Sequence, residues 1–212
     1  MIFQNDILMG TACVARGVIW ALMIFTPTEL TGAFLVDLEP REDARGYFAR
    51  IYCEREFSAH GLPRLTAQAS VSVTRRAGTL RGMHYQAQPH GEDKLVRCLH
   101  GVIWDVIVDL RAESPTYCCW IGVELSESNH RMLLVPKGFA HGLLTLSDDV
   151  VVSYMMSEFY EPAAERGARY DDPAFGIEWP EPVTEISEKD RGWPSFVREK
   201  TVHPAASHEI RE

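Results

Sequence analysis

Short apolar segments with the alternating pattern of β-strands recur along this chain between about residues 32 and 160. Glycine, proline, aspartate and serine separate them, and the connections are only a few residues long. A crossover between parallel strands needs a dozen or more residues, so the spacing favours antiparallel pairing. Many short strands joined by such turns are typical of a β-sandwich or a barrel.

The clearest alternation lies in residues 102–109. One face of this segment carries Val102, Trp104, Val106 and Val108, and the other carries Ile103, Asp105, Ile107 and Asp109. We expect one short helix within residues 53–62, with Gly61 as its stop signal. A second helix or turn over residues 185–196 is expected to lie across the barrel.

Composition excludes some classes of function. The chain has 212 residues, 46% of them hydrophobic, which suits a single domain with a substantial core. A net charge of −9 argues against nucleic-acid binding, although a local arginine cluster can still bind a small anion. The five cysteines are odd in number and irregularly spaced, so we expect reduced thiols in a cytoplasmic protein.

The first 25 residues are unusually apolar, but Asp6 and Arg16 interrupt the pattern of a signal peptide. Residues 17–25 are too few to cross a bilayer, so no membrane association is expected. We expect residues 1–22 to be an N-terminal extension or a mis-assigned start, with an added helix that packs on a partner as the rival reading. Residues 23–200 are expected to form the domain and residues 201–212 a tail.

Two motifs carry the candidate chemistry. "VPKGFAHGLL", residues 135–144, contains a Pro-x-Gly-x-x-His turn that resembles the second sequence motif of cupin barrels, and His141 is its histidine. "GTLRGMHYQ", residues 78–86, contains His84, but Gln86 stands where a metal-binding cupin has its second histidine. Iron, manganese or nickel would require the complete set of imidazole and carboxylate ligands, so we expect no metal.

Six segments together resemble the dTDP-4-dehydrorhamnose 3,5-epimerase family in order and spacing. They are "GTLRGMHYQ", "KLVRCLHGVIWDVIVDLR", "SPTY", "GVELS", "VPKGFAHGLLTLSDD" and "FGIEWP". The resemblance runs from about Met23 to Phe196 and implies an all-β, double-stranded β-helix of the cupin or jelly-roll type with short edge helices. It also implies a homodimer that acts on a dTDP-linked 4-keto-6-deoxy sugar without a cofactor.

By this resemblance, four residues are catalytic. His84 is the base, a role that its usual pKa class suits. Asp190 orients His84, Tyr154 is the acid on the opposite face of the sugar, and Lys94 is the cation beside the ketone. The family's substrate-binding positions correspond to Arg45, Gln68, Arg81, His141, Phe159, Glu165 and Lys189.

Three positions depart from the family's pattern. Arg50 stands where a substrate-contacting glutamate is usual, Ser70 replaces an asparagine, and Phe159 replaces a tyrosine. The proton-transfer residues are kept, and the departures lie around the nucleotide and the rim of the pocket. The alternatives are a 3- or 5-mono-epimerase for another deoxysugar, a non-catalytic sugar-nucleotide-binding cupin, and a metal-dependent cupin oxygenase, which the missing ligand at Gln86 disfavours.

Some of these residues also have ordinary structural explanations. Lys94 could be a solvated charge at a strand edge, and Asp190 a solvent-facing helix end. Asp105 lies among apolar residues and needs a partner if buried, so we expect it to face inward and orient His141. Arg81 and His84 are three residues apart and fall on opposite faces of a regular strand, so a bulge at Gly82 is expected if both enter one pocket.

Overall fold

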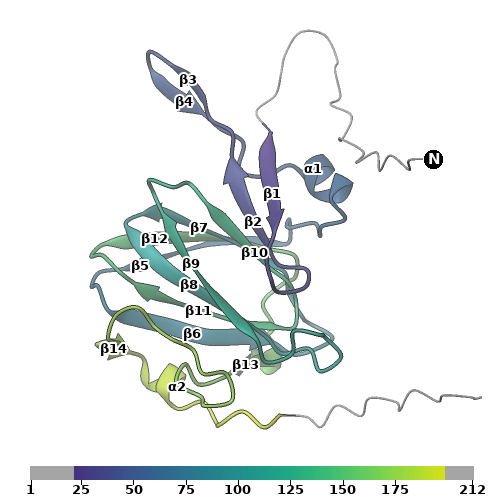
Figure 1. Cartoon of the computed structure of the whole chain (residues 1–212), viewed down its shortest axis with the longest axis vertical. Coiled ribbons are helices and arrows are strands. Elements are labelled where there is room, and N and C mark those ends of the chain that lie inside the picture. The colour runs from purple at the N-terminus through teal and green to yellow at the C-terminus, as the bar shows by residue number, and fades with distance from the viewer. Residues whose placement is uncertain (1–21, 199–212) are drawn as a thin grey trace, which may run out of the picture.

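Two β-sheets face each other in the computed structural model, which describes residues 22–198 (Figure 1). The first sheet has the order β1 (Met23–Pro27), β2 (Phe34–Leu38), β10 (Met132–Val135), β7 (Lys94–His100), β12 (Val150–Met156) and β5 (Gln68–Thr74). The second has the order β13 (Glu165–Gly167), β6 (Thr79–Gln86), β11 (Phe139–Thr145), β8 (Val102–Asp109) and β9 (Trp120–Ser126). These sheets confirm the predicted all-β double-stranded β-helix.

The remaining elements lie at the edges of the barrel. Strand β14 (Glu185–Ile186) pairs with β6 in parallel, whereas the other strand pairs are antiparallel as predicted. A separate hairpin of β3 (Arg41–Asp43) and β4 (Gly46–Phe48) projects away from the barrel (Figure 1). The short helices are α1 (Glu54–Ala59), the 3₁₀ turn η1 (Pro162–Ala164) and α2 (Glu188–Arg191).

Strand β8 shows how the alternating pattern builds the core. Ile103 and Ile107 are fully buried between the two sheets. Val106 and Val108 point to the opposite face and pack beneath the C-terminal segment. A fully buried aliphatic side chain contributes about 1.5–3 kcal/mol. The predicted two-faced strand is therefore confirmed, and both faces stabilise the fold.

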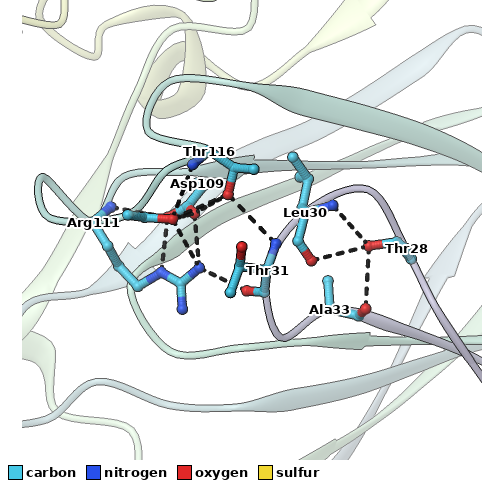
Figure 2. A network of polar contacts seen from close by, with 8 residues as sticks. Thr28, Leu30, Thr31, Ala33, Asp109, Arg111 and Thr116 are labelled. Carbon is cyan, nitrogen blue, oxygen red and sulfur yellow. Dashed lines mark hydrogen bonds and ion pairs between the residues drawn. The ribbon is translucent and has the colours of Figure 1, made fainter. Parts of the chain in front are cut away.

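A polar network connects the end of β8 with the turn between β1 and β2 (Figure 2). The carboxylate of Asp109 is fully buried and accepts hydrogen bonds from Arg111 Nε at 2.8 Å, Ser114 Oγ at 2.5 Å and Thr116 Oγ1 at 2.7 Å. Arg111 also donates to the carbonyl of Thr31 in the β1–β2 turn at 2.7 Å. Burial raises the pKa of Asp109, but these hydrogen bonds outweigh it and leave the pKa below its usual value.

Strand β6 has an irregular register against β11. The pairs His141–His84 and Leu143–Arg81 differ by one residue in their spacing, which marks a bulge. Gly82 lies there with φ +135°, and a Cβ at this position would be 2.5 Å from the backbone of β11. The predicted bulge is confirmed, and it allows Arg81 and His84 to line the same cavity.

The chain ends fall largely outside this description. The expected extension, residues 1–22, is described only at Leu22, and the expected tail, residues 201–212, lies wholly outside the described residues. Between residues 22 and 198, no helix has the length and apolar character needed to cross a membrane.

Candidate active site

A cavity of about 420 Å³ lies between the two sheets. This volume is within the range of small-molecule sites. The predicted site residues that line it are Arg81, His84, Lys94, His141, Tyr154 and Asp190. They come from both sheets and from α2, so groups that are distant in sequence surround one space.

His84 and Asp190 form a hydrogen-bonded pair at this cavity. His84 Nε2 lies 2.6 Å from Asp190 Oδ1, and Asp190 Oδ2 accepts from the backbone N–H of Gly82 at 3.2 Å. Ser187 caps α2 by accepting from the backbone N–H of Asp190 at 3.0 Å. The Asp190 side chain is only 7% exposed, so a solvent-facing helix end is the wrong interpretation. With Nε2 bound to Asp190, Nδ1 of His84 is the nitrogen available to a substrate.

The charge of Asp190 is well supported. Burial raises the pKa of Asp190, but the hydrogen bond to His84 and the electrostatic interaction with it, with the N–H of Gly82 and the Ser187 contact, outweigh burial and lower the pKa overall. An ionised Asp190 favours a proton on Nε2 of His84. This leaves a lone pair on Nδ1, as general-base catalysis requires.

Tyr154 enters the same cavity from the other sheet. It lies on β12, and its hydroxyl is 3.2 Å from Ser72 Oγ on β5. Burial raises the pKa of Tyr154 to about 12, although the hydrogen bond to Ser72 opposes this effect. The phenol therefore carries its proton at neutral pH and can act as an acid.

His141 forms a second histidine–carboxylate pair. Its Nε2 is 2.8 Å from Asp105 Oδ1, and both side chains are buried. This contact confirms that Asp105 faces inward and orients His141. The other oxygen, Asp105 Oδ2, has no hydrogen-bond partner among residues 22–198. The His141 ring lies 6.3 Å from the Tyr154 ring in an edge-to-face arrangement.

Lys94 is held by a buried carboxylate that the sequence interpretation missed. Lys94 Nζ lies 3.0 Å from Glu92 Oε1, and their side chains are 13% and 9% exposed. The solvated strand-edge interpretation of Lys94 is therefore wrong. Gln86 Nε2 donates to Glu92 Oε2 at 3.3 Å and to the carbonyl of Phe159 at 3.2 Å. Residues two apart in an extended segment share a face, and this signal could have identified Glu92.

Arg81 bridges the two sheets at the cavity. It lies on β6, and its Nε donates to Thr74 Oγ1 on β5 at 2.8 Å. Gln86 stands at the position of a metal-cupin ligand, but its amide is occupied by the hydrogen bonds described above. Across residues 22–198, no group of three or more histidine, cysteine, aspartate or glutamate side chains is arranged to hold a metal ion.

The other predicted binding residues cluster in a polar network outside the cavity lining. The backbone N–H of Tyr160 donates to Gln68 Oε1, and the Tyr160 hydroxyl donates to Glu165 Oε2 at 3.1 Å. Lys189 Nζ pairs with Glu165 Oε1 at 2.5 Å and lowers the pKa of that carboxyl. Phe159 is 65% exposed beside this network. Tyr160 was not predicted, although it directly follows Phe159.

Arg45, Arg50 and Ser70 do not line the cavity. Arg45 lies in the β3–β4 hairpin, where its side chain is 89% exposed and pairs with Asp43 at 2.5 Å. Arg50 forms an ion pair with Glu56 of α1 at 2.5 Å. Within residues 22–198, Arg45 contacts none of the residues that line the cavity, and the substrate-binding role predicted for it stays a prediction.

Comparison with known proteins identifies the family. The sequence model of the dTDP-4-dehydrorhamnose 3,5-epimerase family matches residues 27–198. The enzyme of that name from Methanothermobacter thermautotrophicus is 45% identical over 173 residues, 80% of this chain and 92% of the relative. A dTDP-4-dehydrorhamnose 3-epimerase from Streptomyces niveus is 38% identical over 80% of this chain and 82% of its own length.

A solved structure agrees with these matches. The dTDP-4-dehydrorhamnose 3,5-epimerase from Bacillus anthracis, with TDP and pyrophosphate bound, superposes with a TM-score of 0.80. It is 39% identical, and the match covers 82% of this chain and 100% of that one. The barrel and these matches define an isomerase of the sugar-nucleotide epimerase class. The chain belongs to the dTDP-4-dehydrorhamnose 3,5-epimerase family.

Proposed function

We propose that this protein epimerises C3 and C5 of a dTDP-linked 4-keto-6-deoxyhexose, converting dTDP-4-dehydro-6-deoxyglucose to dTDP-4-dehydrorhamnose for deoxysugar biosynthesis. One observation carries the proposal: His84 and Tyr154 enter the same cavity from opposite sheets. Inversion of a carbon requires a proton to leave one face of the sugar and to return on the other. A base and an acid on opposite walls supply both transfers.

The substrate ketone makes this chemistry possible without an external electron acceptor. Nδ1 of His84 takes the proton from a carbon next to the ketone, and the C–H electron pair moves onto the ketone oxygen as an enolate. The ammonium of Lys94 donates to that oxygen and stabilises its charge. Tyr154 then protonates the carbon from the opposite face. Return of a proton from His84 to Tyr154 through solvent restores both groups, and no cofactor is consumed.

The nucleotide end of the substrate is assigned to the network beside the cavity. The relative from Bacillus anthracis binds TDP and pyrophosphate, and Arg81 and Lys189 offer this chain two cations for such a diphosphate. Phe159 presents an exposed ring on which a base can stack. Gln68 and Glu165 anchor the Tyr160 segment that carries this ring.

We further propose a homodimer formed through the outer face of the first sheet. Val71 and Val73 of β5 are 61% and 58% exposed there, and Leu99 of β7 is 44% exposed. Arg97 lies in register with the same face, and its buried Nε has no partner within residues 22–198. A second copy would cover this surface and would give the outlying Arg45 a site to contact.

The dimer can be tested with Val73→Asp, which places a charge on the exposed apolar face. Sedimentation should show a dimer for the native chain and a monomer for the variant. Exposed Val197→Asp is the matched control and should remain dimeric. A native chain that sediments as a monomer at micromolar concentration would contradict the proposal.

A cytoplasmic location is supported by the cysteines. Cys53, Cys98, Cys118 and Cys119 are all free thiols in the structure. Protein purified without reductant should therefore release no additional thiols when a disulfide reductant is added after denaturation. Additional thiols would argue for an oxidising compartment. The acidic net charge gives no support for a nucleic-acid partner.

The reaction is tested by incubating the protein with dTDP-4-keto-6-deoxyglucose in D₂O and following the sugar by NMR. Deuterium at both C3 and C5 is the expected result. Deuterium at one carbon would identify a mono-epimerase, the activity of the Streptomyces niveus relative. Binding without exchange at either carbon would identify a non-catalytic sugar-nucleotide-binding cupin and overturn the proposal.

A further inference from the structure

We propose that Trp193 is a positioning residue that locks the His84–Asp190 pair in place, and that Gly167 provides the slot for its indole. The inference rests on the proposed function, since it concerns the base of that reaction. Trp193 follows α2 directly after Gly192, so it shares a short segment with Asp190. A four-residue helix has little rigidity of its own, and its position depends on what anchors it.

The indole of Trp193 lies against the catalytic base. Its ring is 6.4 Å from the His84 ring at an interplanar angle of 73°, an edge-to-face contact. Lys189 Nζ also lies 5.9 Å from the indole centroid, within the range of a cation–π contact. Trp193 therefore touches the base and also the lysine next to the orienting carboxylate.

Gly167 leaves the space that the indole fills. Gly167 on β13 is paired with His84 on β6, and paired residues share a face of the sheet. A Cβ at Gly167 would lie 2.0 Å from Cε2 of Trp193, a distance that real atoms do not tolerate. The missing side chain thus admits the indole beside His84. Any residue larger than glycine would displace it.

The indole N–H argues for a role beyond stability. Trp193 Nε1 is buried and has no acceptor in the described part of the chain. An unpaired buried donor destabilises a fold, and a phenylalanine would fill much of the slot without one. The presence of an indole at this position is therefore best explained by its contact with His84. It fixes the edge of the His84 ring while Asp190 fixes Nε2, so Nδ1 keeps one direction toward the cavity.

Two readouts test this assignment. Trp193→Ala and Gly167→Ala should each lower kcat about tenfold to a hundredfold with KM nearly unchanged, because a base displaced by about an ångström loses rate. Trp193→Phe should recover much of the loss. In an Asp190→Asn background, Trp193→Ala should lower kcat little further, since both changes act through His84. Trp179→Phe is the matched control. The indole N–H of Trp179 donates a hydrogen bond to the Tyr170 carbonyl at 3.0 Å.

The second readout needs no activity. The short His84–Asp190 hydrogen bond should give a strongly downfield proton resonance that Asp190→Asn abolishes. Trp193→Ala and Gly167→Ala should broaden or shift it, and Trp193→Phe and Trp179→Phe should keep it. An unchanged resonance in folded Trp193→Ala overturns the inference. A native chain without exchange activity instead overturns the proposed function, while the resonance still decides the role of Trp193.

Discussion

Asp190→Asn is the substitution whose effect the geometry defines most closely. Both carboxylate oxygens act as acceptors, one for His84 Nε2 at 2.6 Å and one for the Gly82 N–H at 3.2 Å. A carboxamide has one oxygen and one NH₂ group. If its oxygen faces Gly82, its NH₂ donates to Nε2 and moves the His84 proton to Nδ1, which removes the base. If its oxygen faces His84, two N–H donors meet at Gly82.

The expected loss of rate follows from two contributions. A hydrogen bond to a charged group is worth about 1.5–3 kcal/mol, which corresponds to roughly 10–150-fold in rate. The wrong histidine tautomer adds to this, and the same exchange in a serine-protease triad costs about 10⁴-fold. We therefore expect kcat of Asp190→Asn to fall by about 10²–10⁴-fold while KM changes little.

Initial rates of proton exchange, compared between the native enzyme and Asp190→Asn, measure this fall in kcat directly. Asp171→Asn is the matched control, because Asp171 pairs with Arg169 at 2.8 Å and does not line the cavity. The control should keep full activity, and thermal melting should show both variants folded. A folded Asp190→Asn enzyme with kcat within threefold of the native value would refute the reasoning on the histidine–carboxylate pair.

Two further predictions concern pH. The lowered pKa of Asp109 means that its contribution to stability is present above the unfolded value of about 3.9 and is lost as the pH falls through the lower folded value. Asp109→Asn should cost about 3–5 kcal/mol at neutral pH and flatten this acid dependence in denaturant titrations; equal stability at pH 7 would contradict the network in Figure 2. The raised pKa of Tyr154, about 12, means that its contribution to stability is present below the unfolded value of about 10 and lost as the pH rises through 12. The kcat profile should therefore show no loss from Tyr154 ionisation below about pH 11, and an alkaline limb near pH 9 that coincides with ionisation of Tyr154 in the native enzyme would count against this.

The local sequence pattern was sufficient to predict the strands and one buried pair, Asp105 and His141. Period-two alternation placed Ile103 and Ile107 inside the barrel, because side chains of a strand alternate between its faces. The same alternation put Asp105 inward, and the cost of an unpaired buried charge led to its contact with His141. The odd spacing of Arg81 and His84 likewise indicated the bulge.

Contacts across the fold could not be read from local pattern. Asp190 lies 106 residues after His84, and only resemblance to a family paired them in advance. Trp193 has no periodic signal, since it contacts His84 only because the barrel brings the two residues close. Arg45 was assigned to the substrate, yet its hairpin projects away from the barrel (Figure 1). Under the proposed dimer, a second chain would supply the contact that this assignment needs.

The most direct test separates proton removal from proton return in two variants. With dTDP-4-keto-6-deoxyglucose in D₂O, His84→Ala should show neither deuterium uptake nor epimer, because the base is absent. Tyr154→Phe should still exchange deuterium on the face of His84 while the epimerised sugar fails to accumulate. Normal exchange in folded His84→Ala, or epimer formed at the native rate by Tyr154→Phe, would contradict a base and an acid acting from opposite sheets.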